Sequence, residues 1–78
     1  MLFDYFDYKK FKKEMNSRGH EVHKKGDVIK IIPNNNYLGY NCGFQRATDI
    51  VEGYEDDLEF INMDHFNNII YSAKFKIV

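Results

Sequence analysis

Apolar residues recur at helical spacing near the start of the chain. The stripe consists of Tyr8, Phe11 and Met15. This spacing places the three side chains on one face of a helix, and lysines occupy its other sides. Asp4 is placed to cap the first turn, and Gly19 is placed to end the last turn in the left-handed conformation. We therefore predict an amphipathic helix from Asp4 to about Arg18.

A β-hairpin is predicted directly after this helix. Two short extended runs flank Lys25-Gly26, and glycine tolerates the positive φ of a tight turn. Val22 and the run 28–32 supply the buried side of the hairpin. Pro33 lacks a backbone donor, so we expect it to end the second strand.

Two further segments alternate apolar and other residues with the period of a strand. The first segment, 37–44, has Leu38, Tyr40, Cys42 and Phe44 on one face. The second, at the C-terminus, has Ile69, Tyr71, Ala73, Phe75 and Ile77 on one face and Ser72, Lys74 and Lys76 on the other. Because successive side chains of a strand point to opposite sides, we predict a strand in each segment.

Residues 47–63 fit two patterns. A helical stripe would contain Ile50, Tyr54, Leu58 and Ile61, whereas Leu58 and Phe60 also fit a strand paired across a loop at 63–68. Gly53 and the acidic residues after it favour two separate pieces. Together the segments predict a single α+β domain over residues 1–78. In it, an N-terminal amphipathic helix packs on an antiparallel sheet of four to five strands.

Composition narrows the class of protein. A chain of 78 residues forms one domain with a small core. Cys42 is the single cysteine, so no internal disulfide forms. Asp4 and Asp7 stand where a signal peptide carries positive charge. No apolar run approaches the roughly 20 residues of a membrane helix. We expect a cytoplasmic protein without a membrane segment.

Charge is divided along the chain, although the net charge is only −1. Residues 1–31 hold eight Lys or Arg and five Asp or Glu, a net charge of +3. Residues 46–65 hold one Arg and seven acidic residues, a net charge of −6. Each of these two segments is a candidate binding surface.

Other motifs give weak indications of chemistry. The segment 37–44 lacks the basic residue of an RNA-stacking strand and the Lys-Ser or Lys-Thr of a phosphate loop. His20 and His23 lie three positions apart in a predicted strand, whereas the helical zinc motif needs histidines four apart. Cys42 lies on the apolar face of its strand, as an inert thiol does. We therefore expect no enzymatic activity, no metal site and no cofactor.

The acidic segment after residue 51 is the first candidate site. It comprises Glu52, Tyr54, Glu55, Asp56, Asp57 and Glu59. Carboxylates with an aromatic anchor fit a basic groove of a partner protein and imitate a nucleic-acid backbone in charge. We expect a protein-binding module that blocks a nucleic-acid-binding surface of its partner. In composition alone, the chain looks like accessory proteins of phages and mobile elements, including inhibitors of host defence.

Two alternatives remain open. A nucleic-acid-binding module would use the lysines of the predicted helix and hairpin, which are Lys9, Lys10, Lys12, Lys13, Lys24 and Lys25. A homodimeric structural subunit would pair its sheet edges across a two-fold axis.

Overall fold

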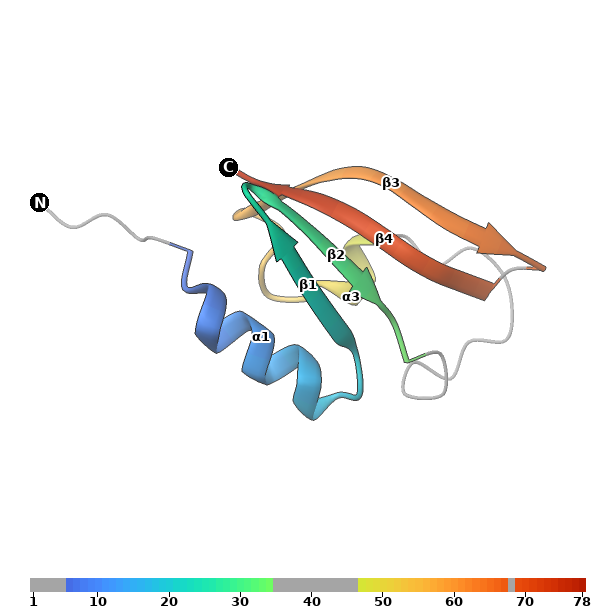
Figure 1. Cartoon of the computed structure of the whole chain (residues 1–78), viewed down its shortest axis with the longest axis horizontal. Coiled ribbons are helices and arrows are strands. Elements are labelled where there is room, and N and C mark those ends of the chain that lie inside the picture. The colour runs from blue at the N-terminus through green and yellow to red at the C-terminus, as the bar shows by residue number, and fades with distance from the viewer. Residues whose placement is uncertain (1–5, 35–46, 68) are drawn as a thin grey trace, which may run out of the picture.

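The chain folds into helices and one antiparallel sheet (Figure 1). The computed structural model describes residues 6–34, 47–67 and 69–78. Its elements are α1 (Tyr8–Ser17), β1 (Glu21–Lys25), β2 (Val28–Ile32), α3 (Ala47–Ile50), β3 (Leu58–Phe66) and β4 (Ile69–Ile77). The four strands lie in the order β1-β2-β4-β3. The predicted α+β fold, with an N-terminal helix on an antiparallel sheet, is confirmed. The strand predicted at 37–44 lies outside the described residues.

Helix α1 begins later than the sequence pattern predicts. Asp7 is the capping residue, and its Oδ1 accepts a hydrogen bond from the backbone N–H of Lys10 at 3.1 Å. The predicted start at Asp4 is wrong, because this bond satisfies the first turn three residues further along. Gly19 has a φ of +86° and its N–H donates to Asn16 O at 2.9 Å, so the predicted left-handed end is confirmed.

The β1–β2 hairpin has a two-residue loop, Gly26-Asp27. Lys25 pairs with Val28 and therefore belongs to β1, so the predicted Lys25-Gly26 turn is displaced by one residue. Gly26 has a φ of +62°, the backbone conformation for which glycine was expected in this turn. β2 ends directly before Pro33, as predicted.

The β3–β4 hairpin is longer than expected. The predicted loop at 63–68 is wrong for its first four residues, since residues 63–66 belong to β3 and pair with β4. The pairing shifts between Asp64 and His65, whose partners are Ser72 and Ile70, so Tyr71 is an extra residue of β4 at this point. The side chains of β4 on the two sides of this irregularity therefore follow a different alternation between the two faces of the sheet. Tyr71 is 54% exposed, which corrects the prediction that it shares the buried face of Phe75.

One hydrophobic core lies on one side of the sheet. Its buried members are Phe11, Met15, Val22, Ile29, Ile31, Ile50, Val51, Leu58, Ile70, Ala73 and Phe75. Helix α1 lies along β1, and α3 lies behind the sheet in the view of Figure 1. The expected division of 47–63 into two pieces is confirmed by the separate α3 and β3. Within the described ranges, no helix is long and apolar enough to cross a membrane.

Candidate functional site

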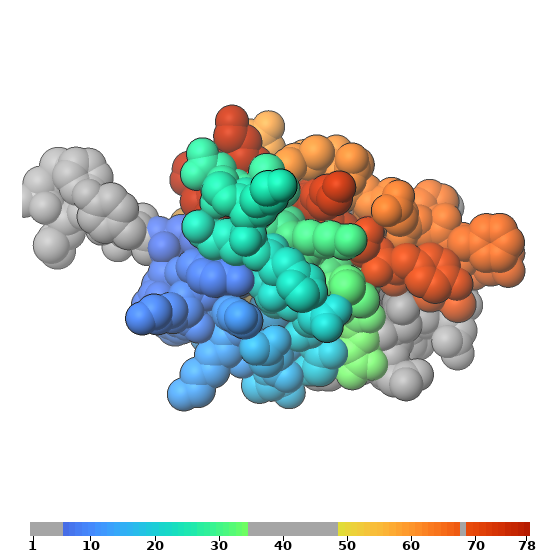
Figure 2. Space-filling view, in the orientation of Figure 1, coloured from blue at the N-terminus to red at the C-terminus, as the bar shows by residue number. Residues whose placement is uncertain are grey.

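Four lysines gather on the side of the sheet opposite the core. Residues that are partners across an antiparallel pair share a face. One row across the strands contains His23, Lys30, Lys74 and Asn62, and the next contains Lys25, Val28, Lys76 and Glu59. We call Lys25, Lys30, Lys74 and Lys76 the lysine face. The visible side of β1, β2 and β4 is not covered by any other described element (Figure 2).

The lysine face surrounds a shallow depression of about 500 Å³. Its lining residues are His23, Lys24, Lys25, Val28, Lys30 and Lys74. Most of the lining is apolar, and the lysine side chains that contribute to it come from three different strands. An open, basic depression of this kind suits a broad anionic partner better than an enclosed small molecule.

The lysine face has few carboxylates to neutralise it. His23 Nε2 lies 3.3 Å from Glu21 Oε2, and no ion pair between described residues involves a lysine. Glu59 is the cross-strand partner of Lys76 without forming an ion pair to it. Among the described residues, no carboxylate forms an ion pair with any of the four ammonium groups.

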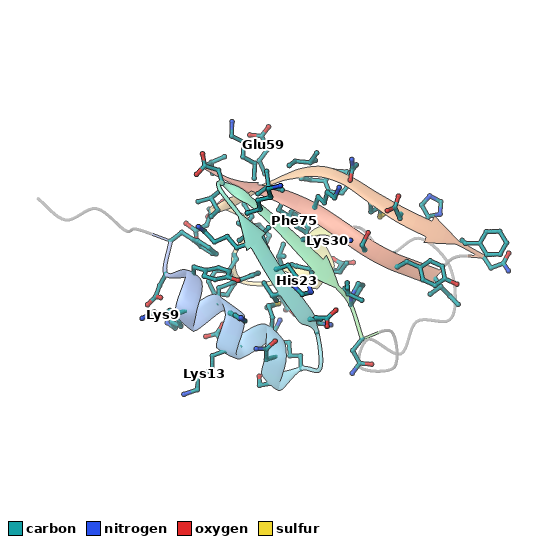
Figure 3. The ribbon with its side chains drawn as sticks, in the orientation of Figure 1. Lys9, Lys13, His23, Lys30, Glu59 and Phe75 are labelled. Carbon is teal, nitrogen blue, oxygen red and sulfur yellow. The ribbon has the colours of Figure 1, made fainter. Side chains whose placement is uncertain are left out.

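The structure divides the lysines that the sequence grouped as a nucleic-acid surface. Lys24 and Lys25 line the depression, and the Lys24 ammonium also lies 5.6 Å from the centre of the Tyr8 ring. The helix lysines Lys9, Lys10, Lys12 and Lys13 are all exposed on α1. Lys9 and Lys13 point away from the sheet, apart from His23 and Lys30 (Figure 3). These lysines therefore form a second basic region.

Sequence reasoning missed three lysines of the site, Lys30, Lys74 and Lys76. The signal was present, because Lys74 and Lys76 alternate with core residues of β4 and Lys30 stands between two buried isoleucines. The sequence pattern did not predict which strands are neighbours in the sheet. Only the pairing of β2 with β4 brings Lys30 beside Lys74.

Within the acidic segment, Tyr54 packs against the N-terminal part of the chain. The Tyr54 ring packs edge-on against Phe11 and Phe6, with ring centres 4.9 Å and 5.9 Å away. Its hydroxyl donates to Glu14 Oε2 at 2.6 Å. Burial, together with this bond to Glu14, raises the pKa of Tyr54 to about 12. Tyr54 therefore packs the turn against α1, and its role in binding a partner stays a prediction.

The carboxylates of the acidic segment have different surroundings. Both carboxylate oxygens of Glu55 accept from the N–H of Gly53, at 2.7 Å and 3.1 Å, so this side chain stabilises its own turn. Glu52, Asp56 and Glu59 are exposed, and Asp57 is half-buried. The role of the segment in binding a partner stays a prediction.

The histidines occupy separate environments. His20 is buried, and its Nδ1 accepts from the N–H of Asn34 at 2.8 Å. Burial, and secondarily the charge of Arg18, lowers the pKa of His20. His23 is exposed on β1. In the part of the chain that the structure describes, no three His, Cys, Asp or Glu residues come together as metal ligands, and Cys42 lies outside that part.

Comparison with protein-family models, with curated proteins and with solved structures found no significant match.

Proposed function

We propose that this protein is a small nucleic-acid-binding module that holds a phosphate backbone against the lysine face. The observation that carries the proposal is the arrangement of four lysines from three strands on one face that no other described element covers. They have no ion-pair partner among the described residues. Phosphate contacts from lysine supply most of the affinity of sequence-independent binding. The proposed activity is therefore non-enzymatic.

The chemistry of the face favours contact with the backbone of a duplex. Its two central rows contain no Phe or Tyr, so stacking on unpaired bases has no platform there. The depression offers no Arg, the side chain that most often reads guanine in the major groove. Lysine contacts to phosphates position a duplex without reading its sequence.

Fluorescence anisotropy with a labelled 20-base-pair duplex tests this proposal. The test variant is Lys30→Ala/Lys74→Ala, and the matched control is Lys9→Ala/Lys13→Ala on α1. We expect the test variant to bind at least about tenfold more weakly at 50 mM salt. The plot of log affinity against log salt has a negative slope, and its magnitude should decrease by about 1.8, or about 0.9 for each lost phosphate contact.

The control variant should keep its affinity within about twofold, because it removes the same charge from a different surface. Equal losses in both variants would show that only total charge matters. An unchanged slope in the test variant would show that the lysine face does not contact phosphates.

A second candidate function is binding to a basic surface of another protein through the acidic segment. Three exposed carboxylates, Glu52, Asp56 and Glu59, support it. The test is a pull-down from a bacterial lysate treated with nuclease, using the protein and its Glu52→Gln/Asp56→Asn/Glu59→Gln variant. A protein retained only by the unmodified chain would favour this second function.

A further inference from the structure

In the part of the chain that the structure describes, most exposed large hydrophobic residues lie on the β3–β4 hairpin. Among the described residues, the exposed large apolar side chains are Phe60, Ile61, Phe66, Tyr71 and Val78. The first three belong to β3, which is an edge of the described sheet. Figure 1 shows that this hairpin extends past the ends of β1 and β2. An edge strand presents unpaired N–H and C=O groups that can pair with another chain.

The two edges of the sheet are protected differently. The edge strand β1 carries Lys24 and Lys25 and lies beside α1. Charged side chains, especially lysine, and covering elements are the usual protection of an edge. β3 has nine residues without lysine or proline. Its protective features are the irregularity between Phe60 and Asn62 and the carboxylates of Glu59 and Asp64. Within the described residues, β3 is therefore the edge of the sheet that can accept an added strand.

The two sides of β3 indicate the chemistry of such a strand. On the core side, Phe60 is 44% exposed while its ring packs on Phe75, with centres 5.9 Å apart. On the open side, Glu59 and Asp64 are exposed carboxylates, and Asp64 accepts a hydrogen bond from Ser72 Oγ at 3.2 Å. An apolar residue would cover Phe60, and a cationic residue would meet the carboxylates.

We propose that the β3 edge binds an extended peptide segment of a partner protein, with apolar residues on the core side and Lys or Arg on the other. The peptide adds a fifth strand to the described sheet. Main-chain hydrogen bonds supply affinity, and the alternate side chains supply specificity. This site adjoins the lysine face, because Glu59 is the cross-strand partner of Lys76, but it does not depend on the proposed function.

A second copy of this chain fits the edge less well. Two copies of β3 could pair as antiparallel strands along their full length. When core-side residues lie opposite core-side residues, Phe60 lies opposite the copy's Met63. The same register places Glu59 opposite the copy's Asp64. Like charges directly opposite each other destabilise a strand pair. A basic segment avoids this repulsion.

The test uses two eight-residue peptides, one alternating valine with lysine and one alternating valine with glutamate. Binding is measured by calorimetry, and the contact is located by the amide NMR shifts of β3. We expect binding of the lysine peptide, with its largest shifts in Leu58–Phe66. The glutamate peptide should bind at least about tenfold more weakly, a difference of about 1.4 kcal/mol.

Two controls separate strand pairing from charge attraction. Two N-methylated versions of the lysine peptide serve as the controls. In each version, N-methyl groups at alternate residues block the backbone N–H groups along one of the peptide's two edges. We expect one version to lose binding and the other to keep it, since an added strand uses one edge. Glu59→Gln should weaken binding roughly fivefold, whereas the matched Glu52→Gln, in the turn, should change it less than twofold.

Three results would overturn the proposal. The first is equal binding of the lysine and glutamate peptides. The second is equal binding of both N-methylated versions. The third is concentration-dependent dimerisation that protects the β3 amides from exchange while no peptide binds, which would assign the edge to a second copy. The Lys30→Ala/Lys74→Ala variant should bind the lysine peptide within about twofold of the unmodified protein, so failure of the duplex experiment leaves this test intact.

Discussion

At the scale of single residues, two polar side chains connect distant segments of the chain through hydrogen bonds. Tyr54 bonds Glu14 across forty positions of the chain, and so connects the acidic turn to α1. His20 bonds the backbone of Asn34 beyond the end of β2. Both bonds are part-buried, where a hydrogen bond is stronger than in water. Neither bond was visible in the sequence pattern, because its partners are distant along the chain.

The buried His20 predicts a dependence of stability on pH. Its Nδ1 must be unprotonated to accept from Asn34, and its pKa is lowered in the folded state. The unfolded chain therefore binds a proton first as the pH falls. The stabilising contribution is complete above the unfolded pKa of about 6.5. It is lost as the pH falls towards the folded pKa.

Urea unfolding between pH 7.5 and pH 5.5 measures this effect. We expect the free energy of unfolding to fall on acidification, with a slope of up to about 1.4 kcal/mol per pH unit from one proton. In His20→Gln the slope should be smaller, whatever its stability at pH 7.5. An identical slope in the variant would assign the pH dependence to other groups.

At the scale of elements, the start of α1 gives a direct comparison of sequence pattern and structure. Asp4 and Asp7 both fit a capping position in the sequence, and the structure assigns the cap to Asp7. We expect Asp7→Ala to lower the free energy of unfolding by about 1 kcal/mol, because it removes the bond to the N–H of Lys10. Asp4→Ala should change it by less than about 0.5 kcal/mol. A larger loss from Asp4→Ala than from Asp7→Ala would contradict this assignment of the cap.

Local patterns predicted the elements better than the site. The stripe of α1 and the alternation of β4 depend on neighbours along the chain, so their periods identified both elements. The prediction of the sheet face on which Tyr71 lies was wrong, because a shift in strand pairing cannot be recognised in an alternating sequence. The candidate site depends on strand order, which places Lys30 beside Lys74. Composition and period carry no information about that order.

At the scale of the whole molecule, helix and sheet depend on the same core. Phe11 of α1 and Phe75 of β4 are both fully buried members of one cluster. A chain of 78 residues has an expected stability of roughly 4 to 12 kcal/mol. Loss of one large side chain therefore removes a substantial part of the total, and the elements should unfold together.

Substitution of Phe75 tests this single core. Phe75→Ala is expected to lower the free energy of unfolding by about 3 to 5 kcal/mol. With a urea dependence of about 1 kcal/mol per molar, the unfolding midpoint falls by about 3 to 5 M. Tyr71→Ala, on the same strand but exposed, should cost less than about 0.5 kcal/mol. Circular dichroism of the helix and tyrosine fluorescence should change at the same urea concentration. A helix signal that persists after the fluorescence change would show that α1 is stable without the sheet, contrary to the shared core.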